Sequence, residues 1–439
     1  MEPTKKSLSK WAFILITGIA TILATLIMIF FFRTNPNSAL SDGVTQIYMA
    51  DNISRAHQIL IDKFNAEHSG RIEVVGVDLP FEKFSTNERK ELLARSLRGK
   101  SDRLDIFAVD LIWVSRFARW AENLDSYFSQ SYRETLLPSA LESCYFDSSL
   151  VALPMYIDIG LMYYRDDLIE KLPNSAEIRK QMAESITWEK LISLKSHVPS
   201  NSPIYLFPGK AYEGLVCSFI ELVGSQGGSI IEGDSVNLNT PYAYRSLKLL
   251  SDLINGHQIT PAEVINYDEI QVYNHAIEED AIFFRGWPGF LEQMDLVDGK
   301  YLNIKKTLLP HFAGSIPKSV FGGWNLMISR YSKNIPQAVE FLRFIQRPEN
   351  QRILFENGGY IPINKLCYQD TQFLKDNPSL MEYKQILSRG FHRPAKENYT
   401  QISDILSYYL NQALKKRMTV RDALKKATRQ INSKKVMVN

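Results

Sequence analysis

The chain has 439 residues, of which 23% are charged and 45% are hydrophobic. This is ordinary globular usage, and the length indicates two or three domains. The net charge of +3 is too small to indicate a nucleic-acid partner, and no long basic run accompanies it. Three cysteines allow at most one internal disulfide, and their spacing fits no zinc site.

An uncharged apolar run occupies residues 11–32. At about 1.5 Å per residue it spans roughly 33 Å, enough to cross the hydrocarbon core of a bilayer. Residues 1–10 contain three lysines and only Arg33 follows closely, so the amino end is expected to stay cytoplasmic and the body to be exported. The run ends without a small-residue cleavage site, which favours an uncleaved anchor over a removed signal. Residues 33–43 are then a polar linker.

The body opens with alternating strand and helix patterns. Strands are predicted at residues 44–50, 72–77 and 105–109, and helices at the apolar repeats of residues 56–64 and 92–97. Such alternation favours an α/β domain with mostly parallel strands.

The stretch of residues 153–168 combines an apolar run with tyrosines and charged residues. Leu161–Tyr164 is predicted to be a strand. Asp158 lies inside the apolar run, where an ionised carboxylate is costly unless something hydrogen-bonds to it. One interpretation is a core strand with an acid at its solvated end, and the other is a strand that delivers Tyr156 and Asp158 into a cleft.

The remaining chain predicts further helices. Residues 338–345 have helical spacing, with a start near Asn334 and Pro336 and a stop at Pro348. Residues 406–431 are predicted to be helical and basic on one face. There is no internal repeat.

Catalytic and cofactor signatures are mostly absent from the sequence. It contains no GxSxG, HExxH, Walker loop or GxGxxG before a helix, and its seven histidines lack metal-ligand spacing. Gly322 and Gly323 are interpreted as turn or close-approach glycines. We therefore expect neither a cofactor nor a metal ion.

Aromatic residues lie beside glycine or proline at predicted ends of strands. Trp287 follows a strand in FFRGWPGF, Trp324 precedes one in FGGWNLMIS, and Asp110 ends the strand DIFAVD. An indole face covers apolar C–H surface while polar groups hold hydroxyls, a combination that suits a sugar. For a single tryptophan, packing in the core is the alternative.

The order and spacing of several motifs resemble the extracellular solute-binding proteins of ABC importers, in the maltose-type sugar-binding group. The chain is most similar to trehalose/maltose-binding proteins in that group. The motifs are LRGKS, DIFAVDLIWVSRFA, LPMYIDIGLMYYRDDLIEKL, GKAYEGLVCSFIE, LPHFAG, GGWNLMISRYS and RPAKENYTQISDIL.

The resemblance implies an α/β, two-lobed periplasmic-binding-protein fold with a hinge and a ligand in the cleft. Lobe 1 would take residues 44–153 and 306–346, and lobe 2 residues 154–305 and 347–439. Ligand-binding residues carried over by motif are Arg89, Asp110, Tyr156, Asp158, Trp287, Gly323, Trp324, Arg393 and Tyr399.

Roles follow from the same resemblance. The two tryptophans would stack on sugar rings, and Arg393 would bond Asp158 or Asp110 as well as the ligand. Related sugar binders have an acid near the start of the first body helix. Here that segment offers only Asp51 or Asn52, which leaves the identity of the sugar open.

The expected function is the substrate-binding component of an ABC transporter. It would capture a disaccharide or related glucoside, such as trehalose or maltose, and deliver it to permease subunits that have a separate ATPase. We expect a monomer outside the cytoplasm, held at the membrane by residues 11–32. The alternatives are an exported glycoside hydrolase or transferase that uses Asp110 and Asp158, and an anchored sugar sensor.

Overall fold

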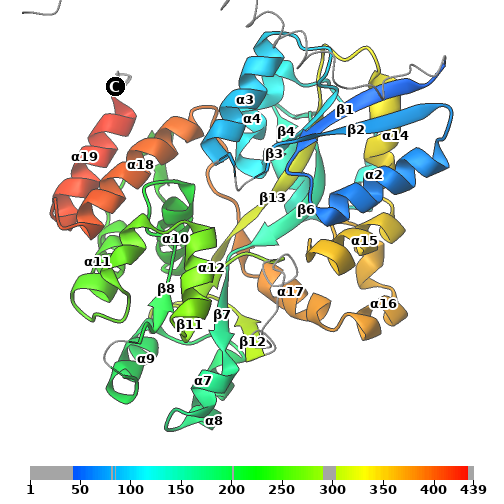
Figure 1. Ribbon diagram of the computed structural model, residues 1–439. Coiled ribbons are helices and arrows are strands. Elements are labelled where there is room, and N and C mark those ends of the chain that lie inside the picture. The colour runs from blue at the N-terminus through cyan, green and yellow to red at the C-terminus, as the bar shows by residue number, and fades with distance from the viewer. Residues whose placement is uncertain (1–42, 81–82, 85, 200–201, 290–302, 434–439) are drawn as a thin grey trace, which may run out of the picture.

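The computed structural model describes residues 43–80, 83–84, 86–199, 202–289 and 303–433 (Figure 1). The expected anchor at residues 11–32 lies outside the described residues. Within the described ranges, no helix has the length and apolar character needed to cross a membrane.

Six strands form the first sheet: β1 (Thr45–Asp51), β2 (Ile72–Asp78), β3 (Ile106–Asp110), β6 (Leu153–Ile159), β13 (Ser319–Ile328) and β14 (Gly390–Phe391). Their order is β14-β13-β3-β1-β2, and β6 also pairs with β13. β1 runs parallel to β2 and β3, as the alternation predicted, whereas β13 runs antiparallel to β3 and β6. The parallel part of the expected α/β domain is thereby confirmed.

Helices cover this sheet: α2 (Arg55–Glu67), α3 (Thr86–Arg98), α14 (Ile335–Ile345) and α15 (Pro348–Gly358). The predicted helix at residues 56–64 is confirmed. Ser54 caps its amino end, and the Ser54 side chain accepts a hydrogen bond from the His57 backbone N–H at 3.4 Å. Its apolar face buries Ala56, Leu60 and Phe64.

The second sheet contains β7 (Leu161–Arg165), β8 (Tyr205–Leu206), β11 (Phe283–Gly286) and β12 (Ile304–Thr307), in the order β12-β7-β11-β8. The predicted strand at Leu161–Tyr164 is confirmed as β7. Around this sheet lie α7 (Asp166–Glu170), α8 (Ser175–Met182), α9 (Trp188–Ser193), α10 (Glu213–Ser225), α11 (Pro241–Asn255), α12 (Glu269–Glu278), α18 (Tyr399–Leu414) and α19 (Val420–Asn432).

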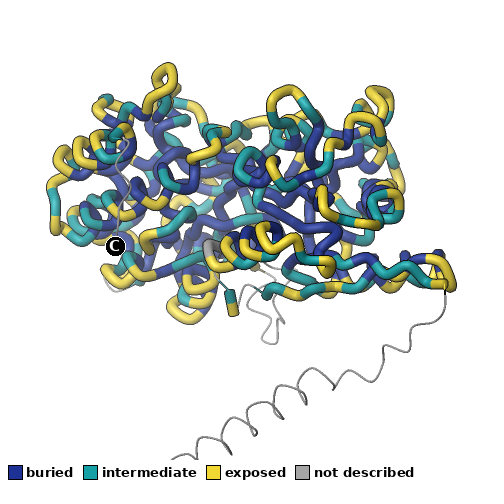
Figure 2. Tube along the Cα trace, turned by 90° about the horizontal axis from the view of Figure 1, so that it is seen from above, coloured by how far each residue is buried: buried dark blue, intermediate teal, exposed yellow. Residues whose placement is uncertain are grey.

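Shorter elements complete the described chain. They are η1 (Leu111–Trp113), α4 (Val114–Phe117), η2 (Ala118–Trp120), α5 (Gln130–Arg133), α6 (Pro138–Leu141), η3 (Glu142–Cys144), β4 (Tyr145–Phe146), β5 (Ser149–Leu150), η4 (Leu194–His197), β9 (Ile231–Glu232), β10 (Ser235–Val236), η5 (Ala262–Asn266), η7 (Lys365–Tyr368), α16 (Thr371–Asp376) and α17 (Ser379–Leu387). Each sheet with its helices has a buried interior and an exposed rim (Figure 2).

Three segments of the described chain connect the two sheets. Gly160 alone separates β6 from β7, residues 308–318 lead from β12 to β13, and residues 389–393 lead through β14 towards α18. Glycine is required at the first connection, because a Cβ atom there would lie 2.0 Å from Glu221 Oε1. The tight strand-to-strand connection brings both sheets close to the candidate site.

Two details differ from the sequence predictions. Trp324 lies within β13 rather than before it, since β13 already begins at Ser319. Residues 406–431 form parts of two helices, α18 and α19, because the chain turns at residues 415–419, where Lys416 has a φ of 55°.

The expected lobe boundaries stay a prediction. Two observations bear on where they would fall: residue 306 lies in β12 of the second sheet, and α15 packs against α2 beside the first sheet. All three cysteines are buried and free.

Candidate functional site

Predicted site residues lie side by side across the first sheet. Trp324 on β13 is the register partner of Asp110 on β3 and of Tyr156 on β6. Asp158 lies two residues further along β6, opposite Gly322. Residues paired in register on neighbouring strands project from the same face of a sheet. The sheet therefore gathers four predicted residues from three distant parts of the chain.

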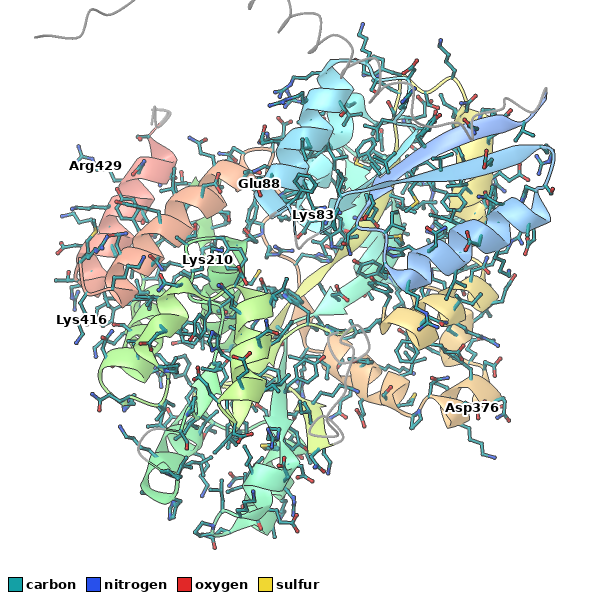
Figure 3. All side chains as sticks on the ribbon, in the orientation of Figure 1. Lys83, Glu88, Lys210, Asp376, Lys416 and Arg429 are labelled. Carbon is teal, nitrogen blue, oxygen red and sulfur yellow. The ribbon has the colours of Figure 1, made fainter. Side chains whose placement is uncertain are left out.

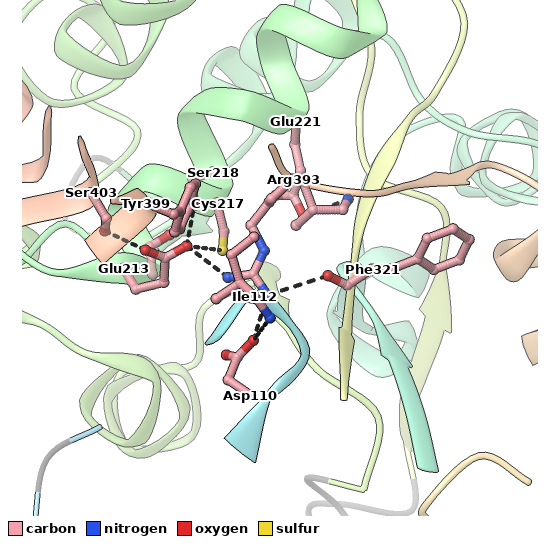
Figure 4. A network of polar contacts seen from close by, with 12 residues as sticks. Asp110, Ile112, Glu213, Cys217, Ser218, Glu221, Phe321, Arg393, Tyr399 and Ser403 are labelled. Atoms are coloured by element: carbon pink, nitrogen blue, oxygen red, sulfur yellow. Dashed lines mark hydrogen bonds and ion pairs between the residues drawn. The ribbon is translucent and has the colours of Figure 1, made fainter. Parts of the chain in front are cut away.

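Arg393 links these residues of the first sheet to helix α10 (Figure 4). Its side chain is 2% exposed, and its Nη2 donates to Asp110 Oδ1 at 3.0 Å. Its Nη1 donates to Glu213 Oε1, at the first turn of α10, at 2.6 Å. A carboxylate partner for Arg393 was expected, and the structure identifies Asp110 rather than Asp158.

Glu213 is a residue that the sequence reasoning missed. Its carboxylate accepts hydrogen bonds from Arg393, from Tyr399 Oη at 2.7 Å and from Ser403 Oγ. Burial and the Glu213 carboxylate raise the pKa of Tyr399 well above its ordinary value, so the hydroxyl remains a donor. The only sequence signal was an acid just before the apolar run GLVCSF, which is equally typical of an ordinary helix start.

Asp158 differs from the other carboxylates of the site. The residue is half-buried, its Oδ1 atom is buried, and no described group donates a hydrogen bond to that atom. Burial, and then the neighbouring Asp110 carboxylate, raise the Asp158 pKa to about 8. An acceptor without a donor in the protein is suited to a donor on a ligand.

The raised pKa predicts a pH-dependent stability. The folded protein holds the Asp158 proton up to about pH 8, whereas the unfolded chain loses it near pH 4. Stability from this group is therefore complete below about pH 4 and falls as the pH rises towards 8, by at most about 1.4 kcal/mol per pH unit. In urea titrations at several pH values, Asp158→Asn should flatten this slope. An identical slope in both proteins would contradict the prediction.

Arg89 and Trp324 pack together rather than lining an open surface. Arg89 is fully buried, its Nη2 donates to Asp51 Oδ1 at 2.9 Å, and its guanidinium lies 4.3 Å from the Trp324 ring centroid. Trp113 meets the same indole edge-on at 6.1 Å. Trp324 is 8% exposed. Asp51, considered from sequence as a substitute ligand acid, is thus engaged by Arg89.

Tyr156 lies in an aromatic cluster next to this pair. Its ring centroid is 4.3 Å from that of Tyr360 and 6.3 Å from that of His57. Tyr360 was missed, since GGYIPINK carries no distinguishing pattern. Burial, and then the neighbouring Tyr360, Asp158 and Asp51, raise the pKa of Tyr156 well above its ordinary value.

Trp287 approaches the site from the second sheet, directly after β11. Its backbone N–H donates to Tyr273 Oη at 3.0 Å and its indole Nε1 donates to Glu269 Oε1 at 3.4 Å. The Arg285 guanidinium lies 4.0 Å from its ring centroid. Unlike Trp324, Trp287 is half-buried, so part of its surface is accessible.

Gly322 and Gly323 allow Trp287 and β6 to approach β13 closely. A Cβ atom on Gly322 would meet Trp287 Cζ3 at 2.8 Å and Asp158 Cβ at 3.3 Å, so the ring and the Asp158 side chain pack over this glycine and leave no room for a side chain there. Gly323 has a φ of +120° and its Cβ position lies 2.5 Å from the Tyr156 carbonyl oxygen. Gly323 is therefore required for the approach of β6 to β13, and a ligand contact there stays a prediction.

A separate cavity of about 600 Å³ lies away from the predicted residues. Its lining comes from the region of α8, α9 and α17: Gln181, Glu184, Ser185, Thr187, Lys190, Leu308, His311, Ile316, Pro317, Gln385 and Arg389. Across the described ranges, no group of three or more His, Cys, Asp or Glu side chains could hold a metal ion.

Comparison with known proteins identifies the family. Residues 49–352 match the profile described as "Bacterial extracellular solute-binding protein". The chain belongs to this family. The family expected from the motifs is thereby confirmed, as is the two-lobed α/β fold of periplasmic binding proteins.

Individual relatives agree with the assignment. The "Probable ABC transporter-binding protein" of Deinococcus radiodurans is 27% identical over 77% of this solute-binding protein and 82% of the relative. Maltose-bound MalE3 of T. maritima is 26% identical, with a TM-score of 0.78 over 89% of this chain and 99% of that one. A Thermotoga lettingae solute-binding protein bound with α-D-tagatose is 20% identical, with a TM-score of 0.76 over the same shares.

Proposed function

We propose that this solute-binding protein captures a disaccharide or related glucoside, of the trehalose or maltose type, for an ABC transporter. The observation that carries the proposal is the convergence at Arg393. Asp110 of the first sheet and Glu213 of α10 meet on its guanidinium, and no described group donates to the buried Oδ1 of Asp158. Ionised carboxylates such as Asp110 and Glu213 form strong hydrogen bonds with sugar hydroxyls, and the Oδ1 atom of Asp158 offers a further acceptor.

Lobe closure supplies the mechanism. Sugar that contacts both lobes binds the closed form better and shifts the population towards it. A shift from 1:99 to 99:1 requires a differential affinity of about 5.5 kcal/mol. Trp287 on one side and Asp110 with Asp158 on the other provide contacts that an open form would lose. The closed form would then dock on a membrane permease whose ATPase is a separate chain.

Residues 11–32 are proposed to hold the protein at the outer face of the membrane. An anchor would keep the binder close to the permease and raise its effective concentration. N-terminal sequencing of the protein purified from membranes tests this proposal: an intact Met1 or Glu2 supports an uncleaved anchor, and a new amino end after residue 32 contradicts it.

A thermal-shift screen of the purified full-length protein tests sugar capture. A ligand present at 100 times its dissociation constant stabilises the native state by about 2.7 kcal/mol. Trehalose, maltose and related glucosides are expected to raise the melting temperature, whereas mannitol serves as a non-cyclic control. Free glucose accumulating in proportion to protein during a long incubation would instead indicate a glycosidase.

Truncation of the accessible tryptophan should weaken sugar binding. Trp287→Ala removes the ring that flanks the Asp158 carboxylate, and we expect at least a tenfold loss of affinity, about 1.4 kcal/mol. Trp324→Ala should also weaken binding tenfold, accompanied by loss of stability because that ring is buried. Titration calorimetry of both variants checks this. If neither loses tenfold, the assignment of ring stacking is wrong. Tyr408→Ala, on an exposed ring of α18, is the control.

A further inference from the structure

We propose that the preferred ligand carries a protonated amine, and that Asp158 next to Trp287 binds it. This inference rests on the proposed sugar-binding function and specifies the substrate class: an amino sugar or an amine-bearing glucoside rather than a neutral disaccharide.

The charges of the site favour a cation. Each buried guanidinium already has a carboxylate of its own: Arg89 has Asp51, Arg285 has Glu221, and Arg393 has both Asp110 and Glu213. Among the described residues, the acids Asp51, Asp110, Asp158, Glu213, Glu221 and Glu269 still outnumber these three guanidiniums when the buried Lys90, whose ammonium acts on Glu213, is added to them. The remaining acids of the site face neutral groups, and a bound ammonium would offset that excess of negative charge.

Asp158 is the acid with the strongest need for such a partner. No described group donates to its buried Oδ1. The groups that act on it or feel its charge are the Asp110 carboxylate and the hydroxyls of Tyr156, Tyr273 and Tyr360. Burial raises the pKa of each tyrosine, so all three are neutral at pH 7. A neutral sugar leaves Asp158 protonated beside the Asp110 carboxylate, whereas a bound ammonium would stabilise the ionised form of Asp158.

The neighbouring aromatic ring suits the same ligand. The Trp287 ring and the Asp158 side chain both pack over Gly322, so the indole and the carboxyl group are neighbours. Its indole Nε1 donates to Glu269, whose other oxygen accepts from the Tyr212 hydroxyl, so Glu269 also has neutral donors here. A carboxylate beside an indole binds an ammonium through an ion pair and a cation–π contact. The charge of Arg285 over the same ring is offset by Glu221.

Binding of an amine should release a proton from the site. Near neutral pH the empty site holds a proton on Asp158. An arriving ammonium favours the ionised carboxylate, so that proton passes to the buffer while the ligand keeps its own protons. A neutral sugar that accepts a hydrogen bond from the protonated acid releases none.

Titration calorimetry of the full-length protein with matched ligand pairs tests the proposal. The pairs are trehalose and maltose against their mono-amino derivatives, and chitobiose, which carries two amines, against N,N′-diacetylchitobiose. At pH 6.5 we expect at least one amino form to bind tenfold or more tightly than its neutral counterpart. Repeating the titration in two buffers with different ionisation enthalpies should show release of a proton.

Variants test whether Asp158 causes the preference for an amino sugar. Asp158→Asn, which keeps the shape of the side chain, should bring the affinity ratio within threefold of one. Asp376→Asn, an exposed acid at the end of α16 far from the site (Figure 3), should keep the ratio. The ligand comparison in the unaltered protein decides the ligand class even if Asp158→Asn fails to fold.

Failure of this inference is distinguishable from failure of the proposed function. Neutral sugars that bind as tightly as amino sugars would overturn the amine preference and leave sugar binding intact. A preference that survives in Asp158→Asn would overturn the assignment to that residue. Absence of binding by every sugar would overturn the proposed function and the inference with it.

Discussion

Arg285→Met is expected to destabilise the protein by about 3–5 kcal/mol, because it leaves Glu221 buried without its cation. The pair is sealed from water, with the two side chains 1% and 4% exposed, and Arg285 donates to Glu221 from Nε at 3.2 Å and from Nη2 at 2.9 Å. Burial raises the Glu221 pKa even with Arg285 present. The free energy of unfolding from denaturant titration measures the loss.

The contacts of the Arg285–Glu221 pair relate its loss to the connection between the two sheets. Glu221 Oε1 also accepts from the Val320 backbone N–H at 3.4 Å, and Gly160 donates to the Val320 carbonyl at 3.1 Å. The pair therefore lies beside the Gly160 connection between the sheets and the start of β13. Arg285→Met/Glu221→Gln should recover part of the lost stability, since neither charge then remains.

Arg71→Met is the matched control for this substitution. Arg71 pairs with Glu340 through two hydrogen bonds, but the side chains are 58% and 37% exposed. Exposed ion pairs contribute at most about 1 kcal/mol. Equal losses in Arg71→Met and Arg285→Met would contradict the importance of burial.

Arg393→Met should reduce both stability and sugar affinity. It removes the guanidinium that pairs with both Asp110 and Glu213, whose side chains are only 17% and 20% exposed. We expect a loss of about 3 kcal/mol, at the low end for buried pairs because both carboxylates keep some water. Affinity for the best sugar should fall at least tenfold, since the two acids would repel each other across the site.

Two further variants separate charge from geometry. Arg393→Lys keeps the charge, but an ammonium cannot reach both carboxylates with the fork of a guanidinium, so an intermediate result is expected. Arg429→Met, on the exposed side of α19 (Figure 3), should change stability by less than about 0.5 kcal/mol. Wild-type affinity in Arg393→Met would contradict the proposed role.

The sequence predicted local structure well where the pattern was periodic. The alternation from β1 to β3 and the strand β7 were predicted from apolar spacing and are confirmed. The break between α18 and α19 was missed because Lys416, in the left-handed turn, is a residue type that rarely marks one. Trp324 was placed before its strand because Gly322 and Gly323 resemble a turn, although both lie inside β13.

Partners of buried charges could not be predicted in the same way. Arg393 and Glu213 are far apart in sequence, and they meet because the segment between β14 and α18 passes the start of α10. The Arg285–Glu221 pair likewise had no signal, because an acid in an apolar helix specifies that it needs a partner but not which one. Asp158 was the exception, since its apolar surroundings within one strand already indicated an unusual carboxylate.

A crystal structure of the full-length protein with its tightest sugar tests the central claim most directly. The account predicts one sugar in contact with Trp287 from the second sheet and with Asp110 and Asp158 from the first. Sugar bound instead in the cavity lined by Leu308, His311 and Arg389, or touching residues of only one sheet, would contradict it.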